Sequence, residues 1–173
     1  NNSTIVIEVG ISVVIDGLST SPNEDGLIVV LGAFDVTVNG PVSLGDGGTI
    51  IMTAFLGDLI VNDTISAAGV VNISLTGQNV YLNSDSDIST HGAGTINVTA
   101  SNGVISMADG VTTTSENGAI TYTATGNAAL SQLISTSGAI TAPPAPAMAA
   151  LITIANMEIL PMLMPCSAAA SGF

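Results

Sequence analysis

The most regular feature of the chain is an alternation of apolar and polar residues with a period of two. In residues 95–101, Ile96 and Val98 alternate with Thr and Asn, and residues 70–76 repeat the pattern. Strict alternation predicts short strands with one buried face. No helical periodicity is found before residue 140. We therefore expect an all-β fold.

A longer repeat groups these strands. An apolar stretch, a polar residue and a second short stretch recur along the chain. The polar residues, which we expect to lie at corners, are Asp16, Asn39, Asn62, Asn83, Asp109, Gln132 and Asn156. A second series has a glycine two residues before an Ile or Val, and its glycines are Gly26, Gly48, Gly69, Gly94, Gly118 and Gly138. Two series with one period indicate a true internal repeat.

This repeat of 20–26 residues, with about three short strands in each unit, predicts a parallel β-helix (β-solenoid) of about seven coils. Each strand is expected to pair in parallel with its equivalent one coil later, because a strand this short is not stable alone. The inward side chains then form stacks along the axis. We expect Ile50, Val71, Ile96 and Ile120 to share one such stack.

The corner residues carry two further expectations. Asn and Asp tolerate left-handed backbone conformations and bond their own backbone, which suits a sharp turn. Asn side chains stacked at the coil rise can also form a hydrogen-bonded ladder. Asp16 and Asp109 place carboxylates in the same row, so turn preference without a ladder is the alternative.

The repeats also resemble a known family. The segments GDLIVNDTISAAG (57–69), TINVTASNGVISMADG (95–110) and NGAITYTATG (117–126) are similar to the repeats of filamentous-haemagglutinin-type exoproteins and giant bacterial surface adhesins. The resemblance covers residues 3–142 and is one of repeat style. It implies a right-handed parallel β-helix, secretion and an adhesive or cell-surface role. The family's Asn-Pro-Asn secretion motif is not in this sequence, so no functional residue is transferred.

The charge composition of the chain limits the classes of molecule that it can bind. The chain has 13 Asp and Glu, no Lys or Arg, and a formal net charge of −13. Phosphate binding depends on Lys and Arg, so nucleic acid is excluded as a partner. The same absence argues against docking on anionic lipid. A surface without basic residues suits exposure to trypsin-like proteases, and we expect an extracellular or cell-surface location.

Composition divides the chain at residue 142. Residues 1–142 carry the β-solenoid repeats, and residues 143–173 are rich in Pro, Ala and Met. We expect the second segment to form a last coil, followed by a cap or by a connector to another subunit. A membrane anchor over residues 147–164 is the rival interpretation. It is disfavoured by Pro161 and by Glu158, since an acidic residue near the centre of a span costs about 2.5–3.5 kcal/mol.

Catalysis has few candidate residues. His91 is the only histidine. A general base needs an orienting acid, and Asp85 and Asp87 are near in sequence but lie across a corner. Lyases of acidic sugars need cationic groups, and β-helix hydrolases use a carboxylate cluster, whereas the acids here are scattered along the repeats. We therefore expect an exposed loop histidine, no catalytic residue and no enzyme activity.

Metal binding has equally weak signals. Asp85 and Asp87, and likewise Glu24 and Asp25, could contribute oxygen ligands to Ca²⁺, which takes six to eight of them. No Asp-rich calcium loop is present, and the single Cys166 excludes a cysteine-based zinc site within one chain. We expect no metal or cofactor site beyond loosely bound Ca²⁺.

An outward Thr-x-Thr pair at Thr121 and Thr123 is similar to those of ice-binding solenoids. The neighbouring coils offer Asn97 and Thr99, and then other polar or apolar residues, so the sequence does not predict a regular threonine array. We do not expect ice binding.

The first coil suggests how the molecule functions. Its sequence STIVIEVGISVVID is apolar and β-branched, with only Glu8 and Asp16 charged and no Pro, whereas natural proteins normally protect an open strand edge. We expect a structural subunit of an extracellular filament or cell-surface fibre that assembles head-to-tail by stacking its coils. The alternative is a stalk or adhesive segment of a large secreted adhesin that binds surface glycans or other surface proteins. A carbohydrate-active β-helix enzyme is a distant third.

Overall fold

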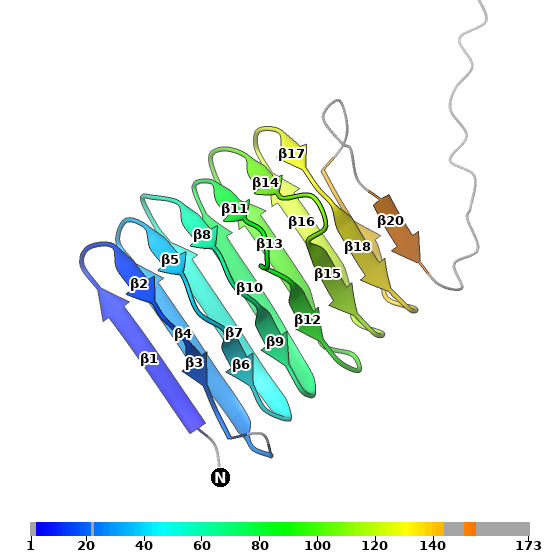
Figure 1. Cartoon of the computed structure of the whole chain (residues 1–173), viewed down its shortest axis with the longest axis horizontal. Coiled ribbons are helices and arrows are strands. Elements are labelled where there is room, and N and C mark those ends of the chain that lie inside the picture. Colours follow the sequence, from blue (N-terminus) through cyan, green and yellow to red (C-terminus); the bar gives the residue numbers. More distant parts are fainter. Residues whose placement is uncertain (1–2, 22, 144–150, 155–173) are drawn as a thin grey trace, which may run out of the picture.

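The chain folds into a β-solenoid with three parallel sheets, as the repeat predicts. The computed structural model describes residues 3–21, 23–143 and 151–154. These residues form 20 β-strands, and none of them lies in a helix. Along the chain, successive strands pass through sheets A, B and C in turn, and each strand pairs in parallel with the equivalent strand of the next coil. Figure 1 shows the coils side by side, with β1 at one end and β20 at the other.

Six coils are complete, and two strands of a seventh are described; we number the coils 1 to 7 from the N-terminus. Sheet A contains β1 (Ser3–Val9), β4 (Asp25–Gly32), β7 (Gly47–Ala54), β10 (Val70–Gly77), β13 (Ile96–Ala100), β16 (Ile120–Ala124) and β19 (Ile140–Thr141). Sheet B contains β2 (Val13–Ile15), β5 (Val36–Val38), β8 (Leu59–Val61), β11 (Val80–Leu82), β14 (Ile105–Met107) and β17 (Ala128–Ala129). Sheet C contains β3 (Leu18–Ser19), β6 (Val42–Leu44), β9 (Ile65–Ala67), β12 (Ile88–Thr90), β15 (Thr112–Ser115), β18 (Gln132–Ser135) and β20 (Leu151–Ile154).

A single stack of isoleucines marks the register of sheet A. Its members are Ile5, Ile28, Ile50, Ile73, Ile96, Ile120 and Ile140. Successive members are 23, 22, 23, 23, 24 and 20 residues apart, within the expected range. Ile28 and the four that follow it are completely buried.

The expected member Val71 is not in this stack. It is buried, but it pairs with Gly48, and Ile73 pairs with Ile50. Val71 therefore takes the place of the glycine in coil 4, and Gly69 is not the equivalent of Gly48. The sequence predicted the correct face because Val71 and Ile73 both point inward, but a period of two allows a shift of two residues without changing the face.

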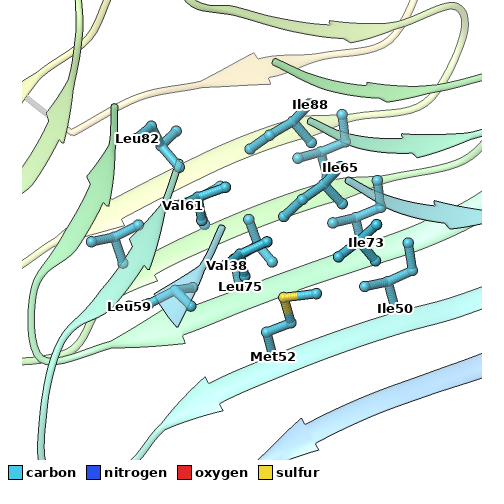
Figure 2. Close-up of a cluster of buried hydrophobic side chains, with 14 of the residues drawn as sticks. Val38, Ile50, Met52, Leu59, Val61, Ile65, Ile73, Leu75, Leu82 and Ile88 are labelled. Carbon is cyan, nitrogen blue, oxygen red and sulfur yellow. The ribbon is translucent and has the colours of Figure 1, made fainter. Parts of the chain in front are cut away.

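The inward side chains of the three sheets meet in one core. Figure 2 shows Ile50 and Ile73 of sheet A together with Val61 of sheet B and Ile65 of sheet C. All four have no exposed surface. Burying an aliphatic side chain of this size contributes about 1.5–3 kcal/mol, so the core is the main source of stability.

Three asparagines form the expected ladder at the corner between sheets B and C. The Asn62 side-chain amide donates to Asn39 Oδ1 at 2.8 Å, and that of Asn83 donates to Asn62 Oδ1 at 2.6 Å. Asp16 follows β2 at the equivalent place in coil 1. The asparagine ladder therefore extends over coils 2–4, where Asn39, Asn62 and Asn83 occupy equivalent positions in successive coils.

The other corner predictions need correction. Ala108, not Asp109, donates its backbone N–H to Leu82 at the equivalent place. Gln132 begins β18 and lies in sheet C, because coil 6 is shorter than the others. Asn156 lies outside the described residues. Left-handed conformations are also not used by the corner residues: within the described part of the chain, Asp85 is the single non-glycine residue with positive φ, at 73°.

Glycines stand where successive coils approach most closely. A Cβ on Gly118 would lie 1.8 Å from the Gly94 carbonyl oxygen, which no side chain can tolerate. A Cβ on Gly48 would lie 1.9 Å from the Gly26 carbonyl oxygen, and Gly48 also has a φ of +122°. The glycine series of the sequence thus reflects backbone contact between coils.

The C-terminal segment is described in part. The backbone of β20 pairs in parallel with β18, so Leu151–Ile154 adds a seventh strand to sheet C. The expected cap, the expected connector and the central and C-terminal parts of the rival membrane anchor fall in residues 155–173, outside the described residues.

Candidate functional site: corners, outer faces and open ends

His91 has an acidic partner that comes from the next coil. Its Nδ1 lies 3.1 Å from Glu116 Oε1, and both side chains are about half exposed. Glu116 Oε2 accepts the backbone N–H of Gly92 at 2.9 Å. This N–H and the His91 ring hold the pKa of Glu116 below its ordinary value. The carboxylate therefore fastens the His91–Gly92 turn to coil 5.

The acids near His91 in sequence have other roles. Asp87 Oδ1 accepts the backbone N–H of Thr112 at 2.7 Å and its hydroxyl at 3.0 Å, which links two coils at the corner between sheets B and C. Asp85, Asp87 and Asp109 line a shallow hollow of about 270 Å³. Within the described ranges, no three His, Cys, Asp or Glu side chains come together in a way that could hold a metal ion.

Glu24 and Asp25, the second acidic pair considered as calcium ligands, also have separate surroundings. Glu24 Oε2 accepts the Ser3 hydroxyl at 2.9 Å and so ties coil 1 to coil 2. Asp25 lies in an open hollow of about 620 Å³ at the corner between sheets C and A, and Asp46 lines the same hollow. Glu24 is therefore a structural link between coils.

A second polar ladder lies at the corner between sheets A and B, and it was missed in the sequence. In each of coils 1–4 a side-chain oxygen accepts the backbone N–H at the equivalent place one coil later. The backbone N–H of Asp35 donates to Ser12 Oγ (3.3 Å), and that of Asp58 donates to Asp35 Oδ1 (2.9 Å). The backbone N–H of Asn79 donates to Asp58 Oδ1 (3.3 Å), and that of Val104 donates to Asn79 Oδ1 (2.9 Å). The spacing of about one coil was the available signal. Asp35 and Asp58 therefore link successive coils at this corner.

The outer faces of sheets A and C carry rows of hydroxyl groups. Sheet A has one row of four threonines, namely Thr53, Thr76, Thr99 and Thr123. Sheet C has a longer row, namely Ser19, Ser43, Ser66, Ser89 and Thr114. The threonine array is thus more regular than the sequence predicted. It is only one residue wide, because the neighbouring row changes from Ile51 to Ser74, Asn97 and Thr121.

On sheet A and at its corner with sheet B, coils 1–3 also expose large apolar side chains. We use the name N-terminal apolar face for the outward residues of sheet A and of its corner with sheet B, namely Val6, Leu27, Val29, Leu31, Ile51, Phe34, Phe55 and Leu56. Phe55 is 60% exposed and Leu56 is 62% exposed, which is unusual for side chains of this size. A groove of about 380 Å³ runs between Leu31 and Phe55, with Glu8 at its border.

Both ends of the rod are open within the described residues. β1, β2 and β3 each stand at the edge of a sheet and pair with one neighbour only. Their inward residues Ile5, Ile7 and Leu18 are partly buried against the core, in contrast to the full burial of their equivalents in the middle coils. At the other end, β19 and β20 are the last strands of sheets A and C. Unpaired backbone groups and apolar side chains thus coincide at coil 1.

Comparisons with protein-family models, with curated proteins and with solved structures found no match to this chain. Among the residues that the structure describes, there is no helix long and apolar enough to cross a membrane. Function must therefore be inferred from the geometry of this chain alone.

Proposed function

We propose that this chain is a structural subunit of an extracellular filament or cell-surface fibre, assembled head-to-tail by stacking of β-solenoid coils. The observation that carries the proposal is the open first coil. β1 is seven residues long, apolar on its inward side, and unpaired along one edge within the described part of the chain. An exposed strand of this kind is a template for pairing with another chain.

The two ends offer matching partners. Stacking coil 7 of one chain on coil 1 of the next would place Ile140 against Ile5, so the isoleucine stack would continue across the junction. Contact between unlike ends is heterologous, and it produces an open filament when the rotation does not close. The net charge of −13 opposes association, so salt or divalent cations should favour assembly.

Two variants that introduce the same positive charge at adjacent positions of β1 test the proposal. Ile5→Lys puts an ammonium group into the inward stack at the open end, whereas Thr4→Lys puts the same group on the outward face of the same strand. We expect Ile5→Lys to abolish sedimenting filaments in the presence of Ca²⁺, and Thr4→Lys to form them as the unmodified chain does. Circular dichroism checks that both variants keep the β-solenoid. Equal filament formation by the two variants would remove the proposal.

The stalk or adhesive segment of a large secreted adhesin is the second candidate. The same open ends would suit further coils of one longer chain, and the repeat style resembles such adhesins. The two candidates differ in the behaviour of the isolated chain. If the unmodified chain stays monomeric at high concentration with Ca²⁺ present, the stalk is favoured and the filament subunit is not.

A further inference from the structure

We infer that the N-terminal apolar face is the docking site for residues 155–173 of the preceding chain in the filament. The inference rests on the head-to-tail stacking proposed above and adds to it a lateral contact that ties two subunits together. It explains why a chain with a fully formed core still exposes large apolar side chains on three coils at one end.

The position of the face is the first argument. It covers coils 1–3 of sheet A and ends where the outward row changes from Ile51 to Ser74. In a head-to-tail stack, coils 1–3 lie directly beyond the junction with the preceding chain. The apolar surface therefore occurs where a segment crossing the junction would meet it first.

The path of the chain is the second argument. Each coil runs through sheets A, B and C in order, so the chain that follows β20 leaves sheet C at the edge where sheet A begins. The next sheet A along the axis is that of the following subunit, which starts with β1. The exit point thus lies beside the starting edge of sheet A, and the N-terminal apolar face extends from this sheet to its opposite corner with sheet B.

Length and chemistry also fit. Nineteen residues follow Ile154, and at about 3.3 Å per residue they can span about 60 Å, whereas three coils occupy only about 14 Å. The segment carries one charge, Glu158, and three methionines, Met157, Met162 and Met164. Methionine adapts to irregular apolar surfaces. The charged residues beside the N-terminal apolar face are Glu8, Asp35 and Asp58, and both aspartates already accept hydrogen bonds within the solenoid.

Docking on the next chain is favoured over docking on the same chain. To reach its own coils 1–3, the segment would have to cross coils 6 to 4, where the outward residues paired across sheet A are Thr, Ser and Asn and the exposed large apolar residue is Val70. That crossing buries little apolar area. Across the junction, the contact begins at coil 1 and meets Val6, Val29 and Ile51 in successive coils.

The sole cysteine gives a direct test, because Cys166 lies in the segment that should dock. One chain of residues 1–173 keeps Cys166. The second carries Cys166→Ser together with a new cysteine in the outward row of sheet A, either Val29→Cys in coil 2 or Thr121→Cys in coil 6. The two chains are mixed under assembly conditions and treated with a short bis-maleimide.

We expect covalent heterodimers with Val29→Cys at a yield at least about tenfold above that with Thr121→Cys, since docking raises the local thiol concentration at coil 2 only. Equal yields at the two positions would overturn the inference. So would a product that is only intramolecular when one chain carries both Cys166 and Val29→Cys, because the segment would then dock on its own chain.

A second variant separates this inference from the proposed function. Phe55→Ser combined with Leu56→Ser removes two exposed side chains from the face without changing an inward position, and it should reduce the crosslink at Val29→Cys severalfold. Filaments seen by negative stain without any crosslink at Val29→Cys contradict the docking alone. Crosslinks without filaments contradict the stacking alone, and the absence of both contradicts both.

Discussion

Coils 1–3 and coils 4–6 share one inward isoleucine stack but differ in their outer faces and in their buried polar groups. On sheet A and its corner with sheet B, the first three coils expose Val6, Phe55 and Leu56, whereas the next three expose Val70 and rows of Thr, Ser and Asn. The buried polar residues, namely Ser86, Thr90, Thr113, Ser115 and Ser135, all belong to the later coils. One inward pattern is thus sufficient for the fold, and the outward positions are free to differ.

The buried hydroxyl groups show how the later coils differ inside. Thr113 lies in the inward stack of sheet C, and its Oγ1 is 2.6 Å from the hydroxyl oxygen of Tyr122 in sheet A. Burial raises the pKa of Tyr122, so the phenol stays protonated. Ser115 and Ser135 accept backbone N–H groups of the glycine turns at 3.0 and 2.8 Å. Every such polar side-chain atom in the described residues has a partner.

The largest expected effect tests the shared core. Ile28→Ala in coil 2 and Ile73→Ala in coil 4 each remove a completely buried side chain from the same stack, and each should lower the free energy of unfolding by about 2–5 kcal/mol. Ser74→Ala, at the adjacent outward position, should change it by less than about 0.5 kcal/mol. Urea unfolding measures all three. A much smaller loss for Ile28→Ala than for Ile73→Ala would mean that the two halves do not share one core.

The next effect tests the buried polar pair of the later coils. Tyr122→Phe leaves the Thr113 hydroxyl buried without its partner, and this should lower the free energy of unfolding by about 1–3 kcal/mol. The double variant Tyr122→Phe with Thr113→Val removes both polar groups and should recover most of the loss. If the double variant is as unstable as the sum of the two single ones, the hydrogen bond is not the cause.

A reciprocal exchange tests the outer faces. Ile51→Thr gives coil 3 the outward residue type of the later coils, and Thr121→Ile does the opposite in coil 6. Both positions are on the solvent side of sheet A, so the free energy of unfolding should change by less than about 0.5 kcal/mol. The fluorescence of a dye that binds apolar surface should fall for the first variant and rise for the second. Unchanged dye binding in both would mean that the apolar face is not accessible.

The smallest expected effect concerns the only His–acid contact in the described part of the chain. Because the folded-state pKa of Glu116 is lowered, its contribution to stability is present above the ordinary value of 4.5 and is lost as the pH falls below that value. The Gly92 amide shift in NMR spectra should therefore titrate with a midpoint below 4.5. Glu116→Gln keeps an acceptor and should abolish the titration. A midpoint at or above the ordinary value would contradict the contact.

The sequence was sufficient for the fold class because alternation and period are local properties. Its errors concern register. Val71 was placed in the isoleucine stack because either of two inward residues satisfies the alternation. Gln132 was placed at a corner because a polar residue between two apolar stretches fits the repeat, whereas it pairs with Thr112 at the start of a strand of sheet C. Register depends on contacts between coils, which one coil's sequence does not contain.

The candidate surfaces were harder to predict for the same reason. Glu116 lies 25 residues after His91 and was not considered as its partner, although one coil period separates them. The N-terminal apolar face was also missed, since it becomes visible only when outward residues such as Val6, Val29 and Ile51 are aligned coil by coil. Once register is known, both features follow from the sequence.

The axial repeat of the assembled material tests the central claim most directly. Seven coils at about 4.8 Å give a subunit repeat of about 33 Å along the filament. Electron microscopy of the unmodified chain with Ca²⁺ should therefore show unbranched filaments with strands perpendicular to the axis, an axial spacing of about 4.8 Å and a subunit repeat of about 33 Å. Monomeric rods at high concentration, or filaments whose strands run along the axis, would contradict the account.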